Sequence, residues 1–328
     1  MTRQDPPRRP TGYPRTGPGP LDRWYEAAGV RTGVRRLFHE EAERGKVFFP
    51  TALVPYVRHE AVAGLPPAHL GELTVRHLYQ FLISTTHLET RIVNEAAEPV
   101  ANNRSGLDLP ASLRMDAFKV YCDEGYHALY SLDLADQIAA VTGIEVPDWD
   151  YGGFVGRLQE AGRSLLPDAP ALAGILQAVV FETLITAVLN EVPGDTTVVG
   201  TVRDLLRDHA RDEGRHHRFF CLLFQELWTR LDTTDRIRAA QAMPAMIRTA
   251  LTWDLQPVRA SLLLAGLDAP TAEEVLRDCY GGDTGDRRIN DIARSTLKLC
   301  ASVGAFDLPG VRETFAAQGL GHPEEEAS

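Results

Sequence analysis

The amino-acid sequence predicts an all-α protein. Long segments of the 328-residue chain place apolar residues three and four positions apart, which is the spacing of helices with one buried face. Alternating strand-like runs bounded by Asn-Gly or Asp-Gly turns are nearly absent. A third observation is a five-residue pattern, D-E-G-x-H, that occurs twice within helical segments. These features together predict helices that direct reactive side chains toward a shared interior.

The positions of the predicted helices follow from this spacing and from residues that favour helix ends. Thr74, Ser112 and Thr271 each precede an apolar run, and a hydroxyl there can accept hydrogen bonds from the first free backbone amides. Gly143 is expected to end a helix. The helices are expected over residues 20–44, 74–101, 112–142, 169–192, 197–230, 234–265, 271–279 and 288–303.

The composition is typical of one helical domain with short polar ends. Hydrophobic residues make up 44% of the chain, and we expect a single domain over residues 20–318. Residues 1–19 are rich in arginine, proline and glycine and are expected to form a disordered tail, and residues 319–328 a flexible acidic tail. Polar residues interrupt the most apolar stretch, 172–189, so no membrane span is expected.

Charge and cysteine usage bear on partners and location. The chain has 34 Lys and Arg against 45 Asp and Glu, a net charge of -11 that repels nucleic acid. The four cysteines lie far apart and form no C-x-x-C pair. They are expected to be reduced thiols in a cytoplasmic protein.

Each copy of the repeated pattern places a carboxylate and an imidazole on one helix face. The first copy supplies Glu124 and His127, and the second supplies Glu213 and His216. Residues three apart lie on the same side of a helix, so each pair can bind a metal ion together. A single E-x-x-H is common on solvated helix surfaces, but the repetition favours a metal site.

A dinuclear site in a four-helix bundle also requires one glutamate from each of the two other helices. Glu89 lies in the apolar-rich run FLISTTHLETRIV, and Glu182 lies in LQAVVFETLITAVL. A neighbouring arginine or a raised pKa can accommodate such a residue on its own, but a divalent metal ion also compensates its buried charge. The order Glu, Glu-x-x-His, Glu, Glu-x-x-His predicts a ferritin-like four-helix bundle, with additional flanking helices.

His209 extends this set of ligands. It lies four residues before Glu213 and seven before His216, and it shares their helix face. An isolated histidine at this place is more often a hydrogen-bonded core residue, but beside two donors we expect it to bind metal. His217 is rotated by about 100° from His216, so no metal role is assigned to it.

The other residues of the pattern are expected to support the ligands. Asp123 and Asp212 precede the ligand glutamates and are predicted to accept hydrogen bonds from ligand imidazoles, with ordinary surface charge as the alternative. Gly125 and Gly214 lie inside helices, where glycine costs roughly 1 kcal/mol relative to alanine. Close packing beside the metals, or room for substrate and oxygen, is the expected compensation. This oxygen-rich set suits iron or manganese, and iron is the better choice for oxygen chemistry.

These residues resemble the non-haem diiron arylamine N-oxygenases, a family typified by p-aminobenzoate N-oxygenase. The similarity covers about residues 89–216, and its most specific part is the H-x-x-x-E-x-x-H triplet with the additional histidine. Ferritins, the small ribonucleotide reductase subunit and multicomponent hydroxylases share the two-fold motif but typically lack that seventh ligand. The resemblance implies that two iron ions are bound by Glu89, Glu124, His127, Glu182, His209, Glu213 and His216.

The resemblance also implies a reaction and partners. The diiron centre would use O₂ as co-substrate to oxidise an amine, preferably an arylamine, to hydroxylamine, nitroso or nitro products in natural-product biosynthesis. Electrons would come from an external donor or reductase. No bound flavin, haem or nicotinamide is expected, since the glycine-rich run 152–156 lacks the strand and spacing of a dinucleotide site. A homodimer is the common default among soluble oligomers in general.

Candidate residues for the substrate pocket lie one helical turn from the predicted ligands or in a late helix. Inward-facing residues would line a cavity, and arginines could bind a substrate carboxylate in a bidentate fashion. Core packing or a surface position explains each of them equally well. The candidates are Phe81, Thr85, Thr86, Thr186, Asn190, Arg288 and Arg294.

Three other functions remain open on the sequence. A diiron hydroxylase acting at carbon would carry the same motif. An iron-storage or ferroxidase protein would also carry it, although such proteins are usually four-helix chains of about half this length. A radical-generating subunit would use Tyr126 or Tyr130, which are close in sequence to His127.

Overall fold

The computed structural model describes residues 19–184, 189, 191–281 and 284–321, and these residues are mainly helical. Within them, the only strand-type pairing is an isolated bridge between Val47 and Val198. The all-α class is therefore confirmed. No helix in the described part of the chain is long and apolar enough to cross a membrane.

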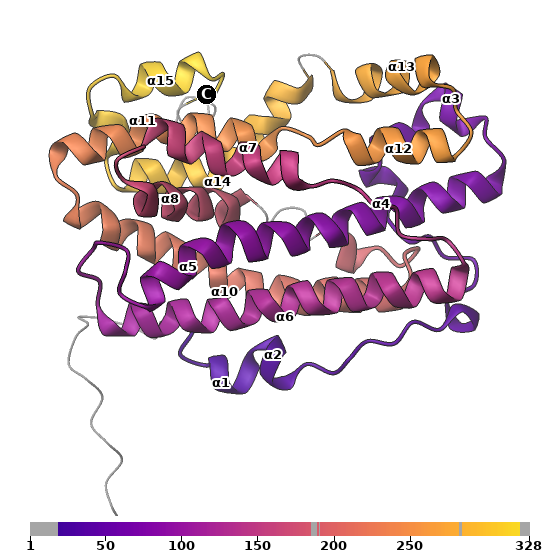
Figure 1. Ribbon diagram of the computed structural model, residues 1–328, viewed down its shortest axis with the longest axis horizontal. Helices are drawn as coiled ribbons and strands as arrows, with labels where there is room; N and C mark the ends of the chain where they lie inside the picture. Colours follow the sequence, from indigo (N-terminus) through magenta and orange to yellow (C-terminus); the bar gives the residue numbers. More distant parts are fainter. Residues whose placement is uncertain (1–18, 185–188, 190, 282–283, 322–328) are drawn as a thin grey trace, which may run out of the picture.

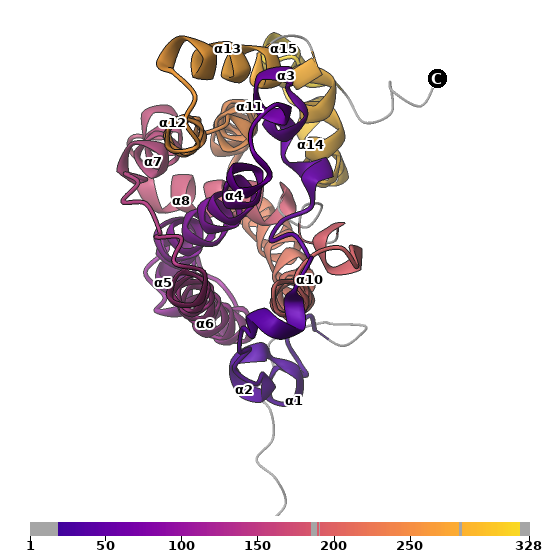
Figure 2. The same ribbon diagram turned by 90° about the vertical axis from the view of Figure 1, so that its right-hand side faces the viewer.

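Four long helical segments form a bundle. They are α4 (Pro67–Leu88) continued by α5 (Asn94–Ala101), α6 (Ala111–Thr142), α8 (Pro170–Leu184) and α10 (Gly200–Arg230). α4 and α5 run beside α6, and α10 packs against both α6 and α8 (Figures 1 and 2). This arrangement is the four-helix bundle that the order of the predicted donor residues requires.

The remaining helices flank the bundle. Most of them gather on the side of α8 and α4, at the top of Figures 1 and 2, whereas the short α1 and α2 lie on the opposite side against α6 and α10. The flanking α-helices are α1 (Trp24–Ala27), α2 (Gly29–Thr32), α3 (Glu60–Ala63), α7 (Gly152–Leu165), α11 (Thr233–Leu251), α12 (Gln256–Leu264), α13 (Ala269–Tyr280), α14 (Thr284–Ser302) and α15 (Val311–Ala317), and short 3₁₀ turns cover Glu40–Glu43, Thr51–Leu53, Pro55–Arg58, Val192–Gly194 and Ala305–Asp307.

Two hydrophobic clusters fill the interior, and a polar layer separates them along the bundle helices. On α6, Val120 belongs to one cluster and Leu134 to the other, and the donors Glu124 and His127 lie between them. On α10, Leu206 and Phe219 belong to different clusters and again bracket the donors. Apolar packing above and below a polar layer keeps water away from it.

A π-helical turn connects α4 to α5 at residues Glu89–Val93. The backbone N–H of Asn94 donates to the carbonyl of Glu89, which is five residues earlier, instead of the four of an α-helix. Such a turn adds one residue to the helix and rotates the side chains that follow. Glu89, the first residue of this turn, is one of the predicted ligands, and π turns are frequent at functional sites.

The predicted helix over residues 20–44 is wrong. Only α1, α2 and a 3₁₀ turn form there, and residues 34–39 run without helical hydrogen bonds. Side chains of α6 and α10 supply partners instead: Phe38 donates its N–H to Gln137, and Arg36 pairs with Asp208. These tertiary hydrogen bonds replace those of a helix.

The helix predicted over residues 234–265 is two helices, and α7 was not predicted. Residues 252–255 separate α11 from α12, because the chain turns there to pack α12 against α4. α7 contains several glycines, which disfavour a helix in isolation, but it packs against α8 and α11. Packing outweighs the local preference in both cases.

The predicted helix starts are also wrong in detail, although the helices themselves exist. The carboxylate of Asp268, not the hydroxyl of Thr271, caps α13, and it accepts the N–H of Thr271 at 2.8 Å. α4 begins at Pro67, so Thr74 lies inside it, and Ser112 is likewise inside α6. The predicted terminator of α6 is confirmed, since Gly143 adopts a φ of 71°.

The predicted tails lie mostly outside the described residues. Residues 1–18 and 322–328 are not described. Leu320 is 2% exposed and belongs to a hydrophobic cluster, and Gly321 donates its N–H to Asn290. The chain therefore packs on the core beyond residue 318, where the tail was expected to begin.

Candidate metal centre

The polar layer of the bundle brings the predicted donor side chains together. Every one of them is 3% exposed or less. Glu89 comes from the π turn, Glu182 lies near the end of α8, and the two D-E-G-x-H motifs face each other from α6 and α10. The buried donors are Glu89, Glu124, His127, Glu182, His209, Glu213 and His216.

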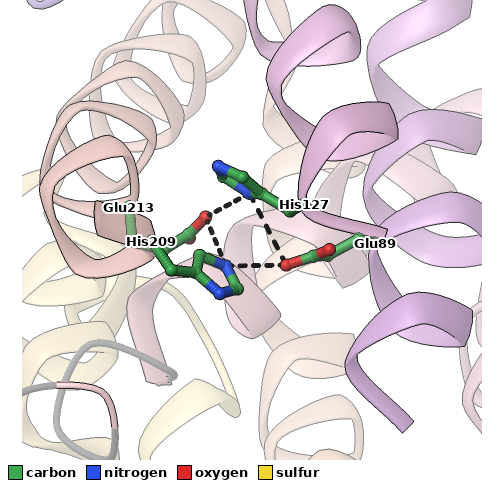
Figure 3. A group of neighbouring side chains, drawn as sticks. All are labelled: Glu89, His127, His209 and Glu213. Carbon is green, nitrogen blue, oxygen red and sulfur yellow. Dashed lines mark ion pairs between the residues drawn. The ribbon is translucent and has the colours of Figure 1, made fainter. Parts of the chain in front are cut away.

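One group of donors consists of Glu89, His127, His209 and Glu213 (Figure 3). The Nε2 atom of His209 lies 2.8 Å from Oε1 of Glu89 and 3.3 Å from Oε1 of Glu213. Nδ1 of His127 lies 3.4 Å from the same Glu213 oxygen and 3.6 Å from Oε1 of Glu89. These four side chains come from three different elements and point at a common centre.

A second group consists of Glu124, His127, Glu213 and His216. Nδ1 of His216 lies 2.9 Å from Oε1 of Glu124 and 3.2 Å from Oε1 of Glu213. Nδ1 of His127 lies 3.2 Å from Oε2 of Glu124. His127 and Glu213 belong to both groups, so the two groups form one continuous cluster.

Glu182 joins this cluster through its carboxylate neighbours. Burial and the like charges of Glu213 and Glu124 raise the pKa of Glu182 well above its ordinary value. Burial also opposes ionisation of Glu213, but His216 and the other imidazoles around it outweigh burial and lower its pKa well below the usual range. The cluster thus concentrates negative charge that only a cation or bound protons can balance.

The two aspartates of the motifs hold the two imidazoles across the bundle. Oδ2 of Asp212, on α10, lies 3.2 Å from Nε2 of His127, on α6. Conversely, Oδ2 of Asp123, on α6, lies 3.1 Å from Nε2 of His216, on α10. Each aspartate therefore orients the histidine of the opposite motif, leaving Nδ1 directed at the cluster.

A segment that sequence reasoning missed holds these aspartates in turn. We term residues 24–38 the N-terminal strap. The indole N–H of Trp24 donates to both oxygens of Asp123 at 2.9 Å, and the backbone N–H of Gly29 donates to Asp212 at 3.1 and 3.3 Å. Arg215 also pairs with Asp212. No local sequence signal connects Trp24 to Asp123, which lies 99 positions later in the chain, so only the tertiary fold reveals this support.

The donor set fits a pair of metal ions. Oε2 of Glu89 and Oε2 of Glu182 are buried and have no hydrogen bond in the described structure. Buried carboxylate oxygens are normally hydrogen-bonded, so unpaired carboxylate oxygens in this cluster are those expected of metal ligands. Oxygen and imidazole donors without thiolates match iron or manganese better than structural zinc.

His209 and Tyr130 differ from their neighbours in their hydrogen bonding. His209 directs Nε2 at the cluster, and its Nδ1 is buried without a partner among the described residues. The hydroxyl of Tyr130 is likewise buried and unpartnered, and its ring lies 5.4 Å from that of His127. Burial raises the pKa of the Tyr130 phenol well above its ordinary value, so it remains protonated. A cavity of about 330 Å³ beneath the strap reaches both Tyr130 and Asp212.

His217 is separate from the cluster. Its Nδ1 lies 3.3 Å from the backbone carbonyl of Glu182, and its Nε2 lies 3.7 Å from the sulfur of Cys221. The rotation of about 100° between neighbouring helical residues accounts for this direction.

The expected role of the motif glycines is wrong. Gly125 and Gly214 are both exposed, and an added Cβ would meet nothing within 4 Å at either position. They therefore neither pack beside the cluster nor leave space inside it. Nothing in the structure of one chain explains Gly214.

Only some of the candidate pocket residues lie near the cluster. Thr85 is buried one turn before Glu89 on α4. Phe81 packs against Phe49, 5.8 Å away between ring centroids, and the Thr86 hydroxyl donates to the carbonyl of Leu82.

The later candidates give no support for a pocket. Arg294 has a side chain that is 54% exposed and paired with Asp291, so it lies on the surface, away from the cluster. Thr186, Asn190 and the side chain of Arg288 lie outside the described residues.

Comparison with known proteins agrees with this geometry. The family model of p-aminobenzoate N-oxygenase AurF matches residues 37–304, which include every donor of the cluster. A search of curated proteins finds no match. The matched region covers most of the chain and both D-E-G-x-H motifs. The chain therefore belongs to the p-aminobenzoate N-oxygenase AurF family and is an oxidoreductase.

Proposed function

We propose that the chain is a diiron N-oxygenase whose cluster of four carboxylates and three imidazoles holds two iron ions. The convergence of these buried donors in one polar layer carries the proposal. Four ionised carboxylates and three neutral imidazoles carry four negative charges, which two divalent cations neutralise. The ligands would be Glu89, Glu124, His127, Glu182, His209, Glu213 and His216.

The contacts within the cluster suggest how the donors divide between the two ions. Glu213 contacts all three imidazoles, and Glu124 contacts two of them, so both carboxylates would help to hold the pair of ions. Glu89 and His209 contact each other and would serve one ion. Glu182, whose charge interacts with Glu213, Glu124 and His216, would serve the other ion.

Bound iron would supply the activation of O₂, and the residues of the chain would make that chemistry selective. Asp123 and Asp212 fix the two imidazoles in the orientation that directs Nδ1 at the cluster. The hydrophobic clusters on both sides of the polar layer exclude water from the reacting centre. Thr85 lies one turn from Glu89 and is assigned to the wall that the amine contacts.

The substrate class follows from the family, and a small arylamine fits it best. Insertion of one oxygen atom of O₂ into the amine nitrogen gives a hydroxylamine, and the second atom leaves as water with two electrons and two protons. Further rounds would give nitroso and nitro products. Each round needs electrons from outside, so a reductase or another external donor is a required partner. The four cysteines are unpaired in the structure, in agreement with action in a reducing cytoplasm.

Product analysis with isotopically labelled O₂ tests this proposal. The protein is loaded anaerobically with two equivalents of ferrous iron and given a reductant, O₂ and a panel of arylamines. We expect mass spectrometry to find label on nitrogen. Glu213→Gln is expected to abolish the product, whereas Glu226→Gln, at a part-exposed position of the same helix, is expected to retain it. Label only on carbon, or an iron mineral without organic product, would show a different function.

The radical-generating alternative has a separate test. The buried hydroxyl of Tyr130 lies beside the cluster, so it is the tyrosine that such a function would oxidise. We expect Tyr130→Phe to retain the N-oxygenated product and the oxygenated protein to lack a tyrosyl signal in electron paramagnetic resonance. A stable tyrosyl signal that disappears in Tyr130→Phe would contradict the N-oxygenase proposal.

A further inference from the structure

A cavity of about 300 Å³ lies beside α8, on a different face of this helix from the metal cluster. Its walls come mainly from α5, α7, α8 and the π turn, which pack against one another, and the three helices lie on the left of Figure 2. Gln177 of α8 lines the cavity, and at about 100° per residue its side chain is turned by about 140° from that of Glu182. The cavity is therefore separate from the candidate metal centre.

The amide of Gln177 is the buried polar group of this cavity. Gln177 is 3% exposed, and its Oε1 and Nε2 atoms are both buried without a hydrogen-bond partner among the described residues. A buried polar group that has lost its hydrogen bonds to water costs free energy unless another partner replaces them. A ligand group that donates to Oε1 and accepts from Nε2 would remove this cost, and a hydroxyl can do both.

The charged side chains of the cavity favour an anion. Arg91, Arg104 and Arg163 line it, and Glu95 is the one acidic residue in the described part of the lining. Arg104 pairs with Glu98, whereas neither Arg91 nor Arg163 forms an ion pair with a described residue. Two guanidinium groups therefore remain for a ligand, and a guanidinium binds a carboxylate through two parallel hydrogen bonds.

The rest of the lining is largely apolar and leaves room for a flat ring. Its apolar side chains are those of Ile92, Pro99, Pro170, Ala171 and Ala173. Gly174 also lines the cavity, and a Cβ there would meet nothing within 4 Å. The volume lies at the lower end of the range for small-molecule sites, so the cavity suits a ligand with a single aromatic ring.

We propose that this cavity binds a hydroxyarene carboxylate, a single aromatic ring with a hydroxyl at one end and a carboxylate at the other. The hydroxyl bonds to both groups of the buried Gln177 amide. The carboxylate pairs with Arg163, which is exposed, and with Arg91, which is half-buried. The ring lies against Ile92 and Gly174. The site does not depend on the proposed reaction, because Gln177 is turned away from the cluster.

Equilibrium dialysis with matched ligands tests the two ends of the site. The full chain is loaded with ferrous iron and kept free of O₂. We expect p-hydroxybenzoate to bind with a Kd below about 1 mM, and benzoate and phenol, which each lack one end, to bind about 10-fold more weakly. In Gln177→Leu, p-hydroxybenzoate and benzoate are expected to bind equally, because no amide remains to recognise the hydroxyl. Arg163→Ala is expected to weaken p-hydroxybenzoate about 10-fold and to leave phenol unchanged.

A pair of glycine substitutions tests where the ligand binds. Gly174→Leu fills the cavity and is expected to abolish binding of p-hydroxybenzoate. Gly156→Leu, on α7, is the matched control and is expected to retain it, because Gly156 is also helical with open space around it but does not line the cavity. Circular dichroism checks that each variant is folded. No binding by the unmodified chain, or binding that Gly174→Leu leaves unchanged, as at the metal cluster, would overturn the proposal.

Discussion

Gly29 provides a sharp test of the link between the N-terminal strap and the metal cluster. A Cβ at position 29 would lie 2.6 Å from Oδ2 of Asp212, the same oxygen that lies 3.2 Å from Nε2 of His127. Restoring an ordinary contact of about 3.2 Å requires a shift of about 0.6 Å, enough to take a hydrogen bond out of its usual range. If the strap moves instead, Asp212 loses the Gly29 N–H. Either response weakens the orientation of His127.

The expected magnitude follows from the role of such supporting carboxylates. Loss of a hydrogen bond to a ligand histidine typically lowers metal affinity 10- to 100-fold, so we expect Gly29→Ala to weaken ferrous iron binding by about this factor. Anaerobic competition with a chelator measures the affinity. Gly214→Ala is the control on the same helix as Asp212, because a Cβ there meets nothing within 4 Å. Unchanged iron affinity in folded Gly29→Ala, together with a loss in Asp212→Ala, would refute the coupling through the strap.

Four further predictions concern the indole of Trp24, two glycines, the α13 cap and the protons of the cluster. Trp24→Phe removes the indole donor to Asp123 and is expected to lower iron affinity about 10-fold. If Trp24→Phe instead lowered iron affinity as much as Asp123→Ala, the indole would be the whole support of Asp123. Gly214→Ala is expected to raise the free energy of unfolding in urea by about 0.5–1 kcal/mol, because position 214 is helical and has open space for a Cβ. Gly310→Ala is expected to lower the free energy of unfolding, because Gly310 has a φ of 74°. Equal effects of the two substitutions would contradict this explanation. Asp268→Ala is expected to lower the free energy of unfolding by about 1 kcal/mol through loss of the α13 cap, and Thr271→Ala by much less. The reverse order would show that Thr271 is the cap, as the sequence predicted. Iron loading in weak buffer near pH 7 is expected to release protons to an indicator dye, and loading without release would contradict the raised histidine pKa values.

The sign of the pH effect follows from these two histidines. Burial alone would lower the pKa of His127 and His216. Tyr130 and the surrounding carboxylates outweigh burial at His127, and the carboxylates do so at His216, so both pKa values are raised well above the ordinary one. In the iron-free protein, their stabilising contribution is complete below about pH 6.5 and is lost as the pH rises through the raised values. Iron requires neutral imidazoles, so its apparent affinity rises with pH over the same window. Urea titrations of iron-free protein at several pH values measure the first effect.

The donors of the cluster could be predicted from the sequence because each combines a functional group with helical spacing. Glu124 with His127, and Glu213 with His216, lie three residues apart, and a regular helix leaves little freedom in where such pairs point. His209 lies one turn earlier on the same helix. The helices that carry these residues are long and strongly periodic, which is why their existence was predicted correctly.

The parts that could not be predicted depend on contacts between distant segments. The strap has local sequence features of a helix, but Trp24 and Gly29 bond to side chains on α6 and α10. The π turn at Glu89 has no local sequence signature, and the cap of α13 lies three residues before the threonine that resembled one. The motif glycines were misjudged because spacing shows which residues share a face but not whether a glycine faces protein or solvent.

The central claim is that the polar layer of the bundle binds two iron ions through these donors. The most direct measurement is a crystal structure of protein loaded anaerobically with ferrous iron, with anomalous scattering collected on both sides of the iron absorption edge. We expect two iron peaks within the cluster, both in contact with Glu213 and separated by about 3.5–4 Å. A single peak, or iron bound outside the cluster while these side chains keep their present contacts, would contradict the account.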